Sequence, residues 1–219
     1  DFIQANTNPD EFNLDSKWSI VLSVGPSMNY RTFNAEGNPA FSAHRNATDA
    51  NLYSTAKRLM VHRKLDTRWS IGAGIAIQDM GEQYAYSLRG EVHSFTNEYQ
   101  YISVPLELDY NITRIGESVN LSIGAGGQYC FLREAISTWI DPDTESAISH
   151  SNKGSDSPFR AGIASVTADM SVDVDLVGDW HVSLSPRATY GIQSIYNADT
   201  GLNQRPLALD LLVGLGINF

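Results

Sequence analysis

The chain has 219 residues, enough for a single domain, and carries a formal net charge of -10. This acidity argues against a nucleic-acid partner, because phosphate binding requires clustered lysine and arginine. The single cysteine, Cys130, excludes an internal disulfide framework and a CxxC metal site. No segment approaches the roughly 18 consecutive apolar residues of a transmembrane helix. A β-barrel remains compatible with the mean hydropathy of -0.23, because its inner face is polar.

The first residues show no strand pattern. The opening Asp1, Phe2, Ile3, Gln4 has neither the basic region nor the apolar core of a signal peptide. We therefore expect residues 1–16 to form a periplasmic tail or linker, in front of a domain at 17–219. An exported protein of this kind would be a mature or trimmed chain.

Period-two alternation of apolar and polar residues predicts eight strands. Four of them begin after a short polar turn and resemble one another, at 17–25, 68–76, 118–126 and 179–187. The other four lie between them, near 52–65, 99–112, 160–176 and 206–219. This order predicts a series of antiparallel up-and-down hairpins.

The last thirteen residues form the clearest strand, with a large apolar residue at every odd position and Phe219 at the end. Such an ending resembles the closing strand of bacterial outer-membrane β-barrels. In those proteins the barrel assembly machinery reads the terminal residues. We therefore predict that Phe219 is part of an assembly signal.

Connections between the predicted strands alternate in length. Short turns are expected near 66–67, 113–117 and 177–179, and long polar loops near 34–51, 80–98, 133–158 and 197–205. Short periplasmic turns opposite longer extracellular loops are typical of transmembrane barrels. The predicted fold is an all-β, eight-stranded antiparallel up-and-down transmembrane barrel.

The two faces of these strands differ in composition. One face is nearly uncharged and carries aromatic rings at the short-turn end, which predicts a membrane-interface girdle of Trp18, Trp69, Tyr110, Trp180 and Phe219. Tyr30, Tyr129 and Tyr190 mark the opposite ends. A water-soluble barrel with an apolar ligand cavity is the alternative, since the pattern alone does not say which face is inside.

The other face carries most of the charges in the strands. It predicts a lumen charge network of Arg31, Arg58, Arg68, Glu107, Asp109, Asp169, Asp173, Arg187 and Asp210. An eight-stranded barrel is just wide enough for side chains to fill, and buried charges must be paired. Glycines on this face leave room for the long side chains, so we expect a polar plug. Pro105, within a strand, predicts a lost ladder hydrogen bond or a bulge, and Pro26 and Pro186 raise the same question.

Several stretches resemble the porin-like outer-membrane β-barrel domain family common in Bacteroidota. They are Ile102–Tyr110 (ISVPLELDY), Leu121–Leu132 (LSIGAGGQYCFL), the paired strands at 164–192 and the terminal LLVGLGINF. The resemblance runs from about Lys17 to Phe219. It implies an outer-membrane location in a Gram-negative bacterium, and the porin-like label does not by itself imply a channel.

Catalytic and metal-binding motifs find little support in the sequence. The histidines show no HxH or HxxxH spacing, and we expect His62 and His181 to point inward and His44, His93 and His150 to lie in solvated loops. A triad of His93 with Glu91 and Ser94 would join sequence neighbours, which seldom have triad geometry. The acidic stretch Asp141, Asp143 and Glu145 could hold calcium, but it lacks the glycine and length of an EF-hand loop.

The sequence thus predicts a non-enzymatic protein without cofactor, with a structural or interaction role. The alternatives are a small passive porin and a lipid-modifying enzyme. The expected partners are outer-membrane lipid and lipopolysaccharide, the barrel assembly machinery, and a protein met through the extracellular loops or the N-terminal tail.

Overall fold

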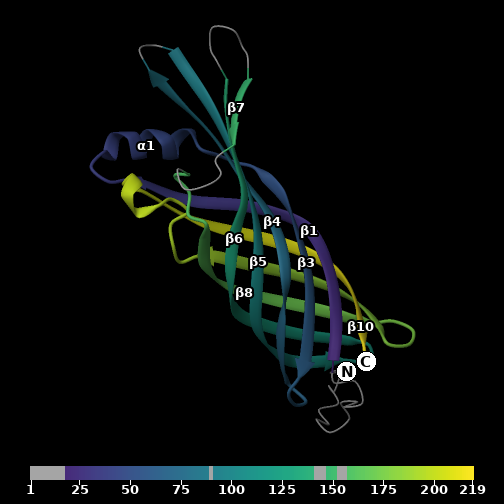
Figure 1. Ribbon diagram of the computed structural model, residues 1–219. Coiled ribbons are helices and arrows are strands. Elements are labelled where there is room, and N and C mark those ends of the chain that lie inside the picture. The colour runs from purple at the N-terminus through teal and green to yellow at the C-terminus, as the bar shows by residue number, and fades with distance from the viewer. Residues whose placement is uncertain (1–17, 89–90, 141–146, 152–156) are drawn as a thin grey trace, which may run out of the picture.

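Eight strands close into a ring in the computed structural model, which describes residues 18–88, 91–140, 147–151 and 157–219. The ring strands are β1 (Trp18–Ala35), β3 (Tyr53–Lys64), β4 (Trp69–Leu88), β5 (Glu91–Ile115), β6 (Val119–Ile140), β8 (Gly162–Asp175), β9 (Trp180–Gly191) and β10 (Leu202–Asn218). Neighbours are antiparallel, and β1 pairs with β10 to close the ring. The predicted fold class is confirmed (Figure 1).

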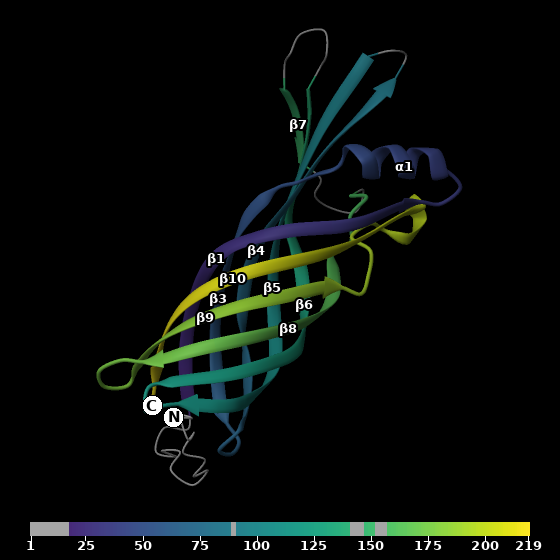
Figure 2. The same ribbon diagram turned by 180° about the vertical axis from the view of Figure 1, so that it is seen from behind.

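Strand register fixes the shape of the barrel. A row of paired residues that starts at Asn218 of β10 passes through His62, Glu107 and Thr167 and returns to β10 at Ala208. The row thus comes back ten residues away along the same strand. This stagger requires the strands to tilt strongly against the barrel axis, as Figure 2 shows.

Three of the four prolines within ring strands coincide with a break in one of their two ladders, and Pro206 lies just past the end of the β9–β10 ladder. Pairing between β4 and β5 stops at Ala73–Leu106 and resumes in the same register at Ala76–Ser103, across Pro105. The ladder between β1 and β10 is interrupted in the same way at Pro26, and the ladder between β8 and β9 at Pro186. Because proline has no N–H to donate, the strand loses hydrogen bonds on one side while its other neighbour stays paired.

The outward face of the ring is an apolar belt. Leu22, Ile75 and Leu106 are each more than half exposed, and similar side chains surround the barrel. A water-soluble protein would not leave a continuous apolar surface of this size in water. The belt therefore faces lipid, which excludes the soluble-barrel alternative.

The first residue of β1, Trp18, and the last residue of the chain, Phe219, lie at the short-turn end of the barrel. The backbones of Trp18 and Phe219 exchange hydrogen bonds of 3.0 and 2.9 Å. Trp180 pairs with Ile217 beside them, and the Trp69 ring lies 4.8 Å from that of Tyr110. These five predicted girdle residues thus share one end of the belt.

The predicted long loops are wrong in detail, because several of them are regular structure. Residues 80–88 and 91–98 continue β4 and β5, and β6 reaches Ile140 and pairs with β7 (Ala147–Ser151). These extensions rise beyond the barrel in both views (Figures 1 and 2). Above the membrane a strand needs no apolar outer face, so the alternation that marks the belt disappears while its β-forming residues remain.

The first long connection holds a helix, α1 (Pro39–Thr48), followed by β2 (Ala50–Asn51), and the last holds a short 3-10 helix, η2 (Ala198–Thr200). Asn38 caps the helix by accepting a 3.0 Å hydrogen bond from the Phe41 N–H, and Pro39 begins it. Among the described residues, no helix is long and apolar enough to cross a bilayer. The predicted tail at 1–16 lies outside the described residues.

An arginine in the middle of the belt tests the membrane-facing assignment. We expect Leu106→Arg to lower the free energy of unfolding in phospholipid vesicles by about 2–4 kcal/mol, because the guanidinium would face hydrocarbon. Ile148→Arg, an equally exposed site on β7, is the control and should cost little. Equal effects in denaturant unfolding of the two variants would contradict the assignment.

Candidate functional site

A polar cavity of about 450 Å³ occupies the lumen and extends to the short-turn end of the barrel. Its wall comes from inward-facing residues of the ring strands, among them Ser19, His62, Asp109, Ser171 and His181, and its mouth includes Asp66 and Asp179. Glycines on neighbouring strands make the room. A Cβ at Gly72 would lie 2.7 Å from the His62 ring. The predicted role of inward glycines is therefore seen directly.

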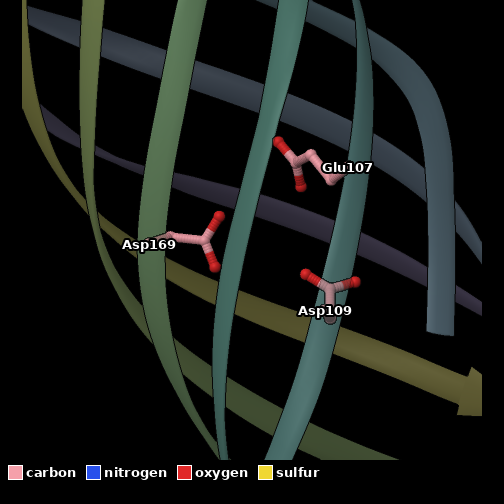
Figure 3. A group of neighbouring side chains, drawn as sticks. All are labelled: Glu107, Asp109 and Asp169. Atoms are coloured by element: carbon pink, nitrogen blue, oxygen red, sulfur yellow. The ribbon is translucent and has the colours of Figure 1, made fainter. Parts of the chain in front are cut away.

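Three carboxylates converge at the inner end of this cavity. Glu107 and Asp109 come from β5 and Asp169 from β8, and an oxygen of each lies within 4.8 Å of the others (Figure 3). Gly124 of β6 lies between them, and a Cβ there would stand 2.5 Å from Asp109 and 2.6 Å from Asp169. Glycine at this position therefore allows the two aspartates to approach across β6.

Two guanidinium groups clamp Glu107. Arg58 of β3 donates to one carboxylate oxygen and Arg187 of β9 to the other, so the three side chains bridge the lumen. Arg187 also donates to the Gln128 side chain at 3.2 Å. Glu107 is 2 % exposed, and a charge so deeply buried is stable only when it is paired.

Asp109 and Asp169 have weaker partners. Asp109 lies 3.1 Å from Nδ1 of His62, and Asp169 has one buried oxygen without a hydrogen-bond partner. A divalent cation would find oxygen ligands here, but it would also meet Arg58 and Arg187 across Glu107. The arrangement therefore fits internal ion pairing better than a metal centre.

An apolar plug fills the lumen above the clamp. Phe33, Tyr99, Tyr101, Phe159 and Ile163 belong to it, and each is no more than 5 % exposed. The Phe159 ring packs edge-on against Tyr99 at 5.0 Å. Cys130 is buried in the same cluster, in keeping with a filling role. The cavity below is thus separated from the extracellular side by close-packed side chains.

A second buried carboxylate, Glu82, lies above the belt, where β4 pairs with β2. It is fully buried and accepts hydrogen bonds from Arg45 of α1 at 2.8 Å, from Gln204 at 2.9 Å and from the Tyr99 hydroxyl at 2.8 Å. Arg31 lies 3.1 Å away on β1. These contacts, which we call the Arg45–Glu82 latch, fix α1 over the extracellular end of the barrel.

Arg45 is held by aromatic faces as well. Its guanidinium lies 3.8 Å from the centre of the Phe33 ring and 4.2 Å from that of Tyr84. Both distances suit cation–π attraction, which is strongest where the cation has lost its water. The arginine therefore anchors α1 through charge and through packing.

The latch shifts the pKa values of its members. Burial alone would lower the pKa of Arg45, but the Glu82 carboxylate keeps it above its ordinary value. Burial opposes ionisation of Glu82 too, yet Arg45 and Arg31 hold its pKa below the usual range. Burial, with Glu82 nearby, raises the pKa of Tyr196 to about 12. Both partners of the latch thus stay charged at neutral pH.

The predicted charge network divides among several places. Arg58, Glu107, Asp109, Asp169 and Arg187 meet at the clamp. Asp210 of β10 is the cross-strand partner of Arg187 beside the clamp, and it accepts a 3.5 Å hydrogen bond from Gln78. The remaining three lie elsewhere. Asp173 accepts a hydrogen bond from Ser171, Arg31 bonds Asp49 and Glu82 in the latch, and Arg68 donates to the Tyr110 hydroxyl at the rim.

Arg45 and Glu82 are not among the predicted site residues, because they lie in segments expected to be polar loops. The Asn38–Pro39 pair was a usable signal, since it is typical of a helix start. Nothing in the sequence linked Arg45 to Glu82, because the two lie in different connections.

The histidines follow the predictions only in part. His62 and His181 line the lumen cavity as predicted. His44 is in α1, His93 in β5 and His150 in β7, so their assignment to loops was wrong. Asp141, Asp143 and Glu145 lie outside the described residues.

Comparison with known proteins supplies a fold and no family. No family model matches the chain, and no curated protein matches its sequence. Among solved structures, Neisserial surface protein A superposes with a TM-score of 0.53 at 8 % identity, covering 92 % of this chain and 97 % of that one. The chain has the fold of a bacterial outer-membrane β-barrel. With the apolar belt, this fold places the protein in the outer membrane.

Two further solved structures resemble this barrel less closely. Outer membrane protein OprG from Pseudomonas aeruginosa is 12 % identical, with a TM-score of 0.46 over 93 % of this chain and 97 % of that one. The attachment invasion locus protein Ail of Yersinia pestis is 13 % identical, with a TM-score of 0.43 over 93 % and 99 %.

Removing the central carboxylate charge should destabilise the barrel. Glu107→Gln leaves Arg58 and Arg187 buried without their counter-ion, so we expect the free energy of unfolding in vesicles to fall by about 3–5 kcal/mol. Asp175→Asn is the control, because Asp175 and its partner Arg114 are each about one third exposed. A loss for Glu107→Gln no larger than for the control would show that the clamp is not needed.

Breaking the latch should loosen α1 while the barrel stays folded. We expect Arg45→Ala to raise amide hydrogen exchange across residues 39–48 by about ten- to hundredfold, since a charged hydrogen bond contributes about 1.5–3 kcal/mol. His44→Ala, its exposed neighbour on the helix, should leave exchange unchanged. Unchanged exchange in Arg45→Ala would mean that other contacts hold the helix.

Proposed function

We propose that this protein is a closed outer-membrane barrel that acts by contact with other molecules and has no catalytic role. The supporting observation is the double closure of the lumen, first by the Arg58–Glu107–Arg187 clamp and then by the apolar plug beneath the α1 latch. An ion that crossed would have to displace paired charges and close-packed rings. The resemblance to the Bacteroidota porin-like family is compatible with this role.

The extracellular extension is the proposed contact surface. It consists of the outer parts of β4, β5 and β6 together with β7, which is exposed along its whole length. Ile140 and Ile148 are 43 % and 51 % exposed there, unusual for large apolar side chains outside a membrane. A protein partner met by this sheet, or by the N-terminal tail on the periplasmic side, would explain why the lumen can be closed.

The remaining proposed partners follow from the fold. Outer-membrane lipid and lipopolysaccharide surround the belt, and the barrel assembly machinery would read the terminal strand with Phe219. No nucleic-acid partner is proposed.

A passive porin is the second candidate, because the lumen does contain a polar cavity of about 450 Å³. A lipid-modifying enzyme finds less support. His93 and Ser94 are successive residues of β5 and point to opposite faces of the sheet, so they do not meet as triad partners. The His93 ring stacks at 6.1 Å on that of Trp139.

Planar-bilayer recording separates the closed barrel from the porin. We expect the purified protein to give no steady conductance. The variants Asp169→Asn and Arg187→Gln, provided that they fold, should also give none. A general porin reconstituted in parallel verifies that insertion would be detected. Reproducible conductance that changes with either substitution would contradict the proposal.

A further inference from the structure

A stripe of polar residues limits the apolar belt on one side of the barrel. On four adjacent strands, β3 to β6, the outward-facing apolar run gives way to a polar residue at its extracellular end. These residues, called the outer stripe below, are Lys57, Asp79, Gln100 and Arg133. The residues directly beneath them are Leu59, Ile77, Ile102 and Phe131. Asp79, Gln100 and Arg133 thus lie at the upper limit of the lipid-facing surface, and Lys57, which pairs with Ile77, lies one row lower.

Hydrogen bonds organise the outer stripe. The Gln100 side chain donates to Oδ1 of Asp79 at 2.8 Å, and Arg133 donates to the side-chain oxygen Oε1 of Gln100 at 2.8 Å. The bond to Asp79 fixes which way the Gln100 amide points, so its oxygen faces Arg133. Asp79 and Gln100 are therefore positioning residues for the guanidinium.

Arg133 lies on the outer face in line with Tyr129 and Phe131, at a β-bulge of β6. Tyr101 pairs with Leu132 and Gln100 pairs with Glu134, which leaves Arg133 as the extra residue of β6. The bulge places the next residue, Glu134, opposite Gln100 and therefore on the same face as Arg133. Arg133 is exposed, and the bond to Gln100 leaves other N–H groups of its planar fork to bind an anion.

Lys57 supplies a second cation on the same side. It faces outward between Val24 of β1 and Ile77 of β4 and is exposed. An ammonium group on this apolar surface is costly unless its long stem reaches the headgroup layer. By contrast, Tyr30 and Tyr190 lie at the outer ends of the apolar runs of β1 and β9, as is typical of an interfacial aromatic row.

We propose that the outer stripe binds a phosphate-bearing headgroup of a glycolipid in the outer leaflet, with Arg133 and Lys57 as the contacting cations. The arginine fork matches a phosphate in geometry, and the lysine adds a point charge. A lipid fits better than a protein here, because the stripe continues directly into the lipid-facing surface. The proposal uses the orientation of the barrel, with its short turns in the periplasm, and is independent of whether the lumen conducts.

Binding of defined lipids to the folded full-length chain tests this proposal. The chain in detergent is titrated with purified lipopolysaccharide, with the same lipopolysaccharide after enzymatic dephosphorylation, with a zwitterionic phospholipid, and with inorganic phosphate. Native mass spectrometry reports the bound species. We expect binding of the phosphorylated glycolipid only, and about tenfold or more weaker binding by Lys57→Gln/Arg133→Gln.

The matched control is Arg63→Gln. Arg63 lies on the same strand as Lys57 and faces outward, but at the periplasmic end, 5.3 Å from the Trp18 ring. Its loss should leave glycolipid binding unchanged. Equal weakening in Arg63→Gln and in the double variant would reduce the effect to net charge and overturn the proposal.

Other results would also overturn it. Equal binding of the dephosphorylated glycolipid would show that phosphate is not recognised, and saturation by inorganic phosphate would show that no lipid is needed. If the double variant does not fold, binding of the phosphorylated and dephosphorylated glycolipids to the unmodified protein still shows whether phosphate is recognised.

Discussion

Lipid on the outside forces the polar residues of this barrel to the inside, where each charge needs a partner. Glu107 meets this requirement with two arginines from distant strands, which places three ring strands in a fixed relation across the lumen. The stagger of ten residues around the ring brings these side chains to compatible heights. The closed lumen follows from this pairing, since the ions that stabilise one another also obstruct the passage.

Glycines on the neighbouring strands, which have no side chain, leave space for these charged groups. Gly124 lets Asp109 and Asp169 approach one another, and Gly72 makes room for His62. Above the clamp the lumen is filled by packed aromatic rings, with few charges. At the extracellular end, where α1 covers the barrel, Glu82 and Arg45 again form an ion pair. The two buried carboxylates serve different ends: Glu107 joins strands, and Glu82 attaches a loop helix to them.

The sequence predicts the barrel within the membrane far better than the structure above it. Strand ends at the short turns agree with the predictions within three residues, because lipid imposes strict alternation there. Beyond Ile77 and Ile102 that constraint ends, and the β4–β5 extension looks like a polar loop. The alternation of inward and outward side chains along each strand is enough to place Arg58, Glu107 and Arg187 on the inner face. Their mutual contact depends on the stagger, and the Arg45–Glu82 pair depends on a helix with only a weak start signal.

Accessibility of the lower cavity from each side of the membrane tests the closed lumen most directly. A single thiol at Ser171, which lines the cavity, is introduced as Ser171→Cys in a Cys130→Ser background and reconstituted in oriented liposomes. A small, charged, membrane-impermeant thiol reagent is then added to one side at a time. The closed barrel predicts rapid modification from the periplasmic side and none from the extracellular side. Modification at similar rates from both sides would contradict it.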